Sequence, residues 1–207
     1  MNQFEHLNDI HIDVLREIGN IGSGNAASAL STMLDRKVDI AVPKVKVLNY
    51  TEVSESLGGP EELMAGLLLT MKEDVTGMIM FLLHKDFAHT VINTLTGMEL
   101  ETIAELDEFS SSAIKEVGNI MAASYVNAIA GLTGLTIDIS PPDVCVDMVG
   151  AILSVPAIYF ANISDKIIFI QDEIDKRENN PRSSSHILMI PETDSLKTIM
   201  ERLGLEL

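Results

Sequence analysis

The sequence has few residues of the kinds that stabilise small secreted proteins or bind nucleic acid. It contains one cysteine, no tryptophan, and only 14 lysines and arginines against 31 aspartates and glutamates, giving a formal net charge of −17. A single cysteine excludes an internal disulfide and is typical of a reducing compartment. Because a strongly acidic chain repels phosphate backbones and anionic lipid heads, neither nucleic acid nor a membrane surface is an expected partner. The charge favours a protein partner with a cationic face.

Long apolar runs are missing as well. No run is long enough to span a bilayer, and residues 1–12 carry acids and histidines instead of the apolar segment of a secretory signal. We therefore expect a cytoplasmic protein. With aromatic residues at 4% and an apolar fraction of 46% over 207 residues, the chain can bury a sizeable core made mainly of aliphatic side chains and methionine.

One stretch of the sequence occurs twice. Residues 13–20 read DVLREIGN and residues 112–119 read SAIKEVGN, an offset of 99 positions. Each copy has an oxygen-bearing side chain, a glutamate four places later and an asparagine three places after that. On an α-helix, at about 100° per residue, these positions fall within roughly 60° of one another. The first triad is Asp13, Glu17 and Asn20, and the second triad is Ser112, Glu116 and Asn119.

The apolar periodicity predicts the remaining elements. Long amphipathic helices are expected over residues 8–34 and from 106 to about 130, each with apolar side chains opposite its triad. Shorter helices are expected at residues 50–57, 84–95 and 195–203. Strands are expected at residues 37–47, 66–72, 77–83, 135–140, 155–163, 166–171 and 186–190, with an unassigned apolar segment at 144–153 and a loop at 175–185.

The repeat extends beyond the triads. Residues 38–40 with Pro43 match residues 137–139 with Pro142 at the same offset of 99. Two halves of this size would rarely hold separate cores, so we expect one α/β (α+β) domain over residues 1–207. Its internal repeats would cover roughly residues 8–97 and 106–204. They would share a central, mainly antiparallel sheet with pseudo-twofold symmetry and both long helices on one face.

Other candidate chemistries are less consistent with the pattern. Gly19, Gly22 and Gly24 lie within a helical segment rather than after a strand, which favours helix packing over a dinucleotide site. No two of the five histidines have the i,i+4 spacing of a helical zinc site. Cys145 lies between acidic residues that disfavour a thiolate, so we expect a buried structural cysteine.

The triads offer a different kind of chemistry. One polar stripe alone would be ordinary solvated surface, but the same stripe displayed twice favours a functional site. A glutamate provides a carboxylate for a partner's lysine or arginine, and an asparagine provides a donor and an acceptor that can orient a water molecule. Because neither residue is a strong base or nucleophile, any catalysis must act on an already activated substrate such as an acyl phosphate.

The residues that carry these features resemble the CheC family of bacterial chemotaxis phosphatases. The similarity includes the doubled triad, the segment EIGNIGSGNA at 17–26, LDEFS at 106–110 followed by EVGNIM at 116–121, the Pro-Pro segment and the final MIP strand. The resemblance covers almost the whole chain. It implies dephosphorylation of the phosphoaspartyl response regulator CheY. Glu17 and Glu116 would form ion pairs with the regulator's active-site lysine, while Asn20 and Asn119 would orient the attacking water.

The resemblance also has implications for the metal ion, the supporting residues and a second partner. Mg²⁺ would be held by the regulator, so this chain would need no cofactor and no metal. Asp13 and Ser112 would have supporting roles. A second partner would be the receptor deamidase CheD, with Asp147 as a contact residue, and a monomer is the expected state of the chain.

Two alternatives remain open at the level of sequence. The first is a non-catalytic binding module of the flagellar switch type, which would bind phosphorylated CheY without hydrolysing it. The second is a scaffold that acts mainly by sequestering CheD. A timed assay of regulator dephosphorylation separates the enzyme from the binding module, whereas the scaffold is compatible with weak phosphatase activity.

Overall fold

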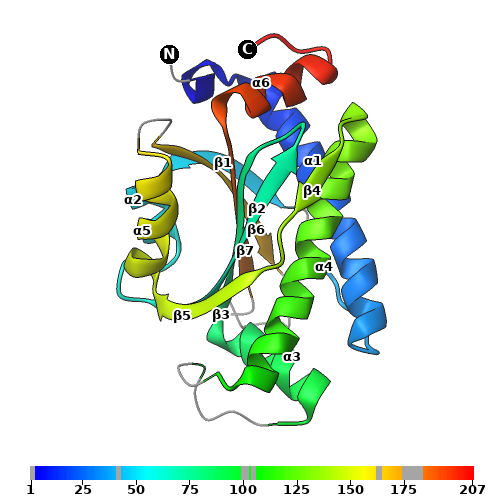
Figure 1. Ribbon diagram of the computed structural model, residues 1–207, viewed down its shortest axis with the longest axis vertical. Coiled ribbons are helices and arrows are strands. Elements are labelled where there is room, and N and C mark those ends of the chain that lie inside the picture. The colour runs from blue at the N-terminus through cyan, green and yellow to red at the C-terminus, as the bar shows by residue number, and fades with distance from the viewer. Residues whose placement is uncertain (1–2, 41–42, 99–102, 104–105, 162–164, 174–183) are drawn as a thin grey trace.

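A run of apolar residues at the centre of the chain determines the layered architecture. In β3 (Gly77–His84) the first seven residues are buried, so this strand needs a covering layer on both faces. The structure is a computed structural model that describes residues 3–40, 43–98, 103, 106–161, 165–173 and 184–207. Helices lie on both faces of one antiparallel sheet whose strands differ in length (Figure 1). The predicted α/β fold with a mainly antiparallel sheet is confirmed.

Seven strands form the sheet within the described residues. Besides β3 they are β1 (Lys44–Asn49), β2 (Leu63–Glu73), β4 (Ile137–Ile139), β5 (Asp143–Met148), β6 (Lys166–Glu173) and β7 (Ser184–Pro191). Their order is β1-β6-β7-β3-β2-β4, and β5 also pairs with β2. Every pairing is antiparallel.

The strands are arranged symmetrically about the centre of the sheet. The central β3–β7 pair is flanked by β2 and β6, and these pair in turn with β5 and β1. The two outer strands, Lys44–Asn49 and Asp143–Met148, begin and end 99 positions apart, which is the offset of the triads. The arrangement therefore has the pseudo-twofold symmetry expected of the fold. The exact limits of the two repeats remain a prediction.

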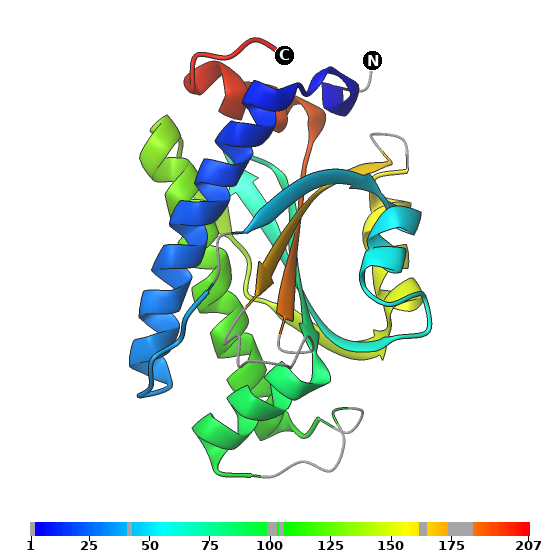
Figure 2. The same cartoon turned by 180° about the vertical axis from the view of Figure 1, so that it is seen from behind.

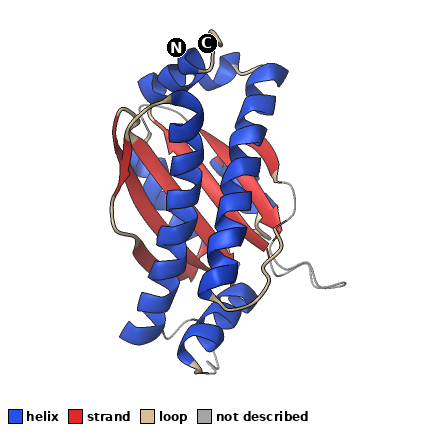
Figure 3. Cartoon of the chain, turned by 90° about the vertical axis from the view of Figure 1, so that its right-hand side faces the viewer, coloured by secondary structure: helices blue, strands red, loops and turns tan. Residues whose placement is uncertain are grey.

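Two long helices cover one face of the sheet. They are α1 (Asp9–Met33) and α4 (Glu108–Thr133), which run side by side in opposite directions (Figures 2 and 3). Their starts follow from capping residues: Asn8 forms a capping box with His11, and the Asp107 carboxylate accepts from the Ser110 N–H. Gly134 ends α4 in the left-handed conformation, with φ of 70°. Both helices agree with the predicted ranges.

The other helices complete the layers. On the opposite face lie α2 (Tyr50–Ser56) and α5 (Val149–Tyr159), while α3 (Lys85–Thr96) and α6 (Thr193–Arg202) lie at the two ends of the helix pair (Figure 1). A short 3-10 helix, η1 (Gln3–His6), precedes α1. The apolar side chains form one core between the sheet and α1 and α4, and a second core between the sheet and α2 and α5.

Glycines allow the long helices to pack closely. A Cβ added to Gly22 would lie 2.7 Å from the Tyr125 ring, and one added to Gly118 would overlap a methyl carbon of Leu67. Among the described residues, no atom outside the adjoining residues and the neighbouring helix backbone lies within 4 Å of a Cβ added to Gly24. The packing role predicted for the glycine cluster is therefore confirmed for Gly22 and not for Gly24.

The segment after β5 differs from its prediction. The strand expected at residues 155–163 is wrong, because α5 continues to Tyr159. Val149, Ile152, Leu153 and Pro156 are buried, which is helical spacing. The β-branched residues favour a strand locally, but packing against the second core selects the helix. The apolar segment 144–153 accordingly divides between β5 and α5.

Other differences are smaller. In the strand expected over residues 37–47, regular pairing begins only at Lys44, and residues 41–42 lie outside the described part of the chain. The strand expected at 135–140 is limited to Ile137–Ile139. The loop expected at 175–185 lies mostly outside the described residues, and its last two positions belong to β7.

Candidate functional site

Each triad lies on the outward side of its helix. All three side chains of the first triad are exposed on α1, and those of the second triad are exposed on α4. The intervening Leu15 and Ile18 are buried beneath the first triad, and Ile114 and Val117 are buried beneath the second. The core therefore fixes the rotation of each helix, and that rotation presents glutamate and asparagine together to solvent. The structure thus places Glu17 with Asn20, and Glu116 with Asn119.

The two triads form separate sites. Because α1 and α4 are antiparallel and contact each other at Ser23 and Tyr125, the two asparagines lie on opposite sides of that contact along the helix pair. Asn20 precedes Ser23 by three residues and Asn119 precedes Tyr125 by six, so the asparagines are offset by roughly 14 Å along the axis at 1.5 Å per residue. The two Glu/Asn pairs are therefore separate features of the surface.

The first positions of the two triads make different local contacts. The Asp13 carboxylate accepts a hydrogen bond from the Arg16 guanidinium at 2.5 Å. The Ser112 hydroxyl donates to the backbone carbonyl of Glu108 at 2.9 Å. Neither bond is made to the glutamate of the same triad. The two sites therefore differ in charge beside otherwise equal Glu/Asn pairs.

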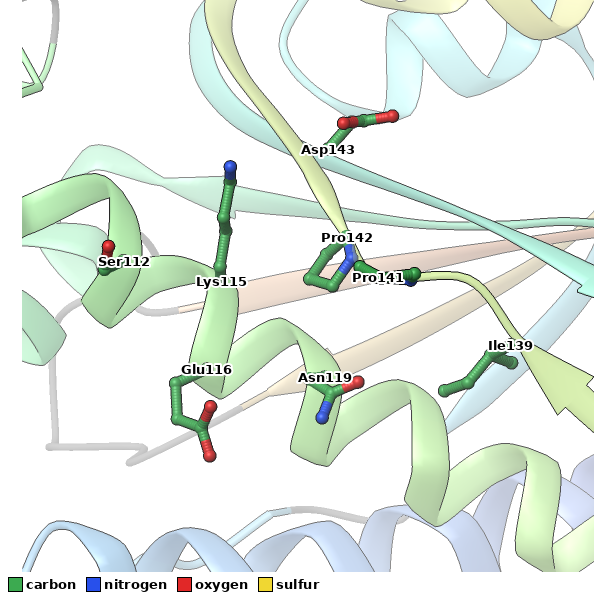
Figure 4. Close-up of a pocket in the computed structure, with 8 residues that line it drawn as sticks. All are labelled: Ser112, Lys115, Glu116, Asn119, Ile139, Pro141, Pro142 and Asp143. Atoms are coloured by element: carbon green, nitrogen blue, oxygen red, sulfur yellow. The ribbon is translucent and has the colours of Figure 1, made fainter. Parts of the chain in front are cut away.

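A hollow of about 530 Å³ lies beside the second triad. We call it the second-site hollow, and Figure 4 shows the residues that line it: Ser112, Lys115, Glu116, Asn119, Ile139, Pro141, Pro142 and Asp143. One wall is α4, and the other is the connection between β4 and β5. Consecutive prolines cannot donate ladder hydrogen bonds, so they interrupt the strand that would otherwise continue along β2. The sequence indicated this break but not the hollow that it forms.

The helix start that positions the second triad is held electrostatically. Asp107 caps α4 just before Ser112, and hydrogen bonds from Ser110, first from its backbone N–H, lower the pKa of the Asp107 carboxyl. An ionised carboxylate at a helix N-terminus also interacts favourably with the helix dipole. The cap therefore remains charged and anchored at neutral pH.

A second feature lies on β5 and α5, on the face of the sheet opposite α1 and α4. Asp147 is exposed and its carboxylate accepts from the Met148 N–H at 2.7 Å. The exposed apolar side chains that begin there and continue along α5 are Met148, Val155, Ile158 and Tyr159, with Ile158 77% exposed. We call these four residues the α5 apolar face. Sequence reasoning missed it because residues 144–153 were left unassigned and residues 155–163 were predicted as a strand.

Cys145 is not the buried residue that was predicted. It lies on edge strand β5, where Val144 and Val146 pack on the core and the alternate side chains point outward. Partial burial and the nearby Asp147 carboxylate raise the pKa of the Cys145 thiol. The raised pKa favours the protonated thiol, as expected, although the side chain is exposed to solvent.

The described residues contain neither a metal cluster nor a membrane-spanning helix. No group of three or more histidine, cysteine, aspartate or glutamate side chains there is placed to hold a metal ion. None of the helices in this part of the chain is long and apolar enough to cross a membrane. The absence of a cofactor stays a prediction.

Comparison with known proteins assigns the family. The CheC-like family profile matches residues 10–47 and again residues 109–146, so each match contains one triad. The chain is 35% identical over 210 residues to CheY-P phosphatase CheC of Bacillus subtilis, with full coverage of both chains. It is 31% identical over 143 residues to the flagellar motor switch phosphatase FliY of the same organism, covering 69% of this chain and 37% of FliY.

Solved structures share the fold. The crystal structure of Thermotoga maritima FliY aligns with a TM-score of 0.74 and 27% identity over 96% of this chain and 98% of that chain. FliM of H. pylori, crystallised with SpeE, aligns with a TM-score of 0.68 and 15% identity over 96% of each chain, which supports the fold alone. Both curated relatives are named phosphatases, in agreement with the predicted enzyme class. This protein therefore belongs to the CheC-like family, as the doubled motif predicted.

Proposed function

We propose that this protein is a phosphatase that dephosphorylates phosphorylated CheY in bacterial chemotaxis. The observation that carries the proposal is the display of two separate Glu/Asn pairs, each exposed on a long helix whose rotation is fixed by the core. The proposal is supported by full-length similarity to CheY-P phosphatase CheC of Bacillus subtilis. An acyl phosphate is activated already, so a pair that only orients a water and anchors the partner is sufficient.

The proposed reaction assigns one role to each residue type. Glu17 or Glu116 forms an ion pair with the lysine in the regulator's active site, and this holds the two proteins in register. Asn20 or Asn119 accepts and donates hydrogen bonds to orient a water molecule. The water oxygen attacks phosphorus, the bond from phosphorus to the aspartyl oxygen breaks, and the products are inorganic phosphate and the free carboxylate. Mg²⁺ is held by the regulator in this proposal.

The test is the rate of phosphate loss from the regulator with and without this protein. The quadruple variant Glu17→Gln, Asn20→Ala, Glu116→Gln, Asn119→Ala should return the rate to the regulator's own value. One positioning group typically contributes about 10²–10³-fold to a rate. Asn25→Ala and Asn127→Ala are matched controls, because both asparagines are exposed on the same two helices. If the quadruple variant accelerates dephosphorylation as well as the parent, the site assignment is wrong.

A non-catalytic binding module is the rival function. Such a module would bind the phosphorylated regulator while leaving its phosphate unchanged or protected. The intact Glu/Asn pairs in both halves favour hydrolysis, since a binding module has no need of an oriented water. The same timed assay decides between them, because a pure binder gives no acceleration at any concentration.

We propose a second activity, binding of the deamidase CheD at Asp147 and the α5 apolar face. Exposed apolar side chains beside a carboxylate are typical of a protein interface, and Val155, Ile158 and Tyr159 share one side of α5. Asp147→Asn and Ile158→Asp should each weaken CheD binding measured by calorimetry, whereas Lys197→Ala on the far helix α6 should not. Equal affinities for all variants would exclude this face. Strong CheD binding without phosphatase activity would instead favour the scaffold function.

A further inference from the structure

A basic residue precedes the glutamate of each triad, and its ion pairing differs between the two sites. Arg16 and Lys115 occupy equivalent positions, 99 residues apart. Arg16 forms an ion pair with Asp13 on its own helix. At the second site Ser112 replaces that aspartate, and among the described residues Lys115 has no ion pair.

The surroundings of Lys115 leave its ammonium group accessible. The side chain is exposed, and it lines the second-site hollow together with Asp143 (Figure 4). No ion pair joins these two side chains, although both line the hollow. Lys115 also lies one helical turn before Asn119, within reach of whatever docks against that asparagine.

We propose that Lys115 is a positioning residue of the second site, where it pairs with an anionic oxygen of the docked partner, and that Asp13 withholds Arg16 from the same role in the first site. The inference rests on the proposed phosphatase function. The oxygen belongs either to the phosphoryl group or to a carboxylate beside it, and both are recognised by the same charge. The two sites thus have the same catalytic pair but different affinity for the partner.

The first experiment isolates each site. In the background Glu17→Gln, Asn20→Ala, only the second site remains, and Lys115→Gln should raise KM by about two- to five-fold, the range for exposed ion pairs. The value of kcat should change little, because uniform binding is lost rather than transition-state stabilisation. Arg16→Gln in the background Glu116→Gln, Asn119→Ala is the matched control and should change KM less. The Lys115 effect should also shrink in high salt.

The second experiment exchanges the neighbouring residues. Ser112→Asp supplies the missing carboxylate three residues before Lys115 and should raise KM of the second site to about the level of Lys115→Gln. Combined with Lys115→Gln, the same substitution should add little, which shows that it acts through the lysine. Asp13→Ser should release Arg16 and lower KM of the first site.

A binding measurement identifies the anionic oxygen. If Lys115→Gln weakens binding of the phosphorylated regulator alone, the phosphoryl group is the contact; if it weakens both forms, a carboxylate is. Equal effects of Lys115→Gln and Arg16→Gln overturn the inference, as does a second site that is inactive by itself. Failure of the proposed function is distinct, because then the parent protein itself would not accelerate dephosphorylation of the regulator. Thermal unfolding of each variant verifies that these exposed substitutions leave the fold intact.

Discussion

The hydroxyl oxygens of Ser23 and Tyr125 lie 2.6 Å apart in the buried interface between α1 and α4. Ser23 is 3% exposed and Tyr125 is 1% exposed, so the bond is shielded from water. The Tyr125 ring packs over Gly22, which has no side chain to obstruct it. This contact lies between the two triads along the helix pair, and it fixes the two site-bearing helices relative to each other.

Removal of this contact should lower stability. Ser23→Ala and Tyr125→Phe should each reduce the free energy of unfolding by about 1 kcal/mol, because each leaves a buried hydroxyl with one hydrogen bond fewer. In a double-mutant cycle measured by urea unfolding, the coupling between the two substitutions should be about 0.5–1.5 kcal/mol. A coupling near zero would mean that the two hydroxyls contribute independently.

Neighbouring glycines of α1 should respond in opposite directions to alanine. At Gly22 the new methyl group would lie 2.7 Å from the Tyr125 ring, so the helices must move apart, at a cost of about 1–3 kcal/mol. At Gly24, no atom of the described residues beyond the adjoining helix backbone and chain neighbours lies within 4 Å of the new methyl group. Gly24→Ala should therefore stabilise the protein by up to about 1 kcal/mol through helix propensity. Urea unfolding of both variants checks the sign, and stabilisation by Gly22→Ala would contradict the close packing.

The two triads should contribute independently to the phosphatase rate. Because they lie on opposite sides of the Ser23–Tyr125 contact, the rate of the parent protein should equal the sum of the rates of the two single-site proteins. One single-site protein carries Glu17→Gln with Asn20→Ala, and the other carries Glu116→Gln with Asn119→Ala. Their free energies of unfolding should stay within about 0.5 kcal/mol of the parent, since all four side chains are exposed. A large deviation from additivity in the timed assay would show that the sites communicate.

His186 should make stability depend on pH. This residue is 2% exposed, stacks on Phe169 with ring centroids 5.5 Å apart and contacts the His84 ring. Burial, and secondly the nearby His84, lower the pKa of His186 to about 4 from 6.5. Between these values the unfolded chain binds a proton that the folded chain does not, so stability falls as pH decreases from 6.5 to 4. The full loss is about 3 kcal/mol at 1.36 kcal/mol per pKa unit.

The variant His186→Gln separates the contribution of His186 to the pH dependence of stability from the contribution of the carboxylates. Urea unfolding at pH 7 and at pH 4.5 should show a smaller decrease in stability for the variant than for the parent. Below about pH 4 the two curves should run parallel, because the histidine is then protonated in both states. Identical decreases across the whole range would mean that the pKa of His186 is the same in the folded and unfolded protein.

Local signals in the sequence predicted the parts that depend on local physics. Asn8 at the start of α1 and glycines after α3 and α4 are capping residues whose effect needs no distant contact. The strand predicted at 155–163 failed for the opposite reason: the burial of Ile152 and Pro156 depends on a second core that distant strands provide. The burial predicted for Cys145 was wrong because only the strand order of the sheet shows that β5 is an edge strand, paired with β2.

The sequence by itself determined which polar side chains the chain displays twice. The spacing of glutamate and asparagine places them on one side of a helix, and the offset of 99 shows that this happens twice. Only the tertiary structure decided how the two copies relate: α1 and α4 run antiparallel, so the pairs form two sites instead of one. The structure also separates Arg16, paired with Asp13, from Lys115, which lies in a hollow bounded by the chain between β4 and β5. Periodicity fixes the face on which a side chain lies, but distances between segments far apart in the chain are set by packing.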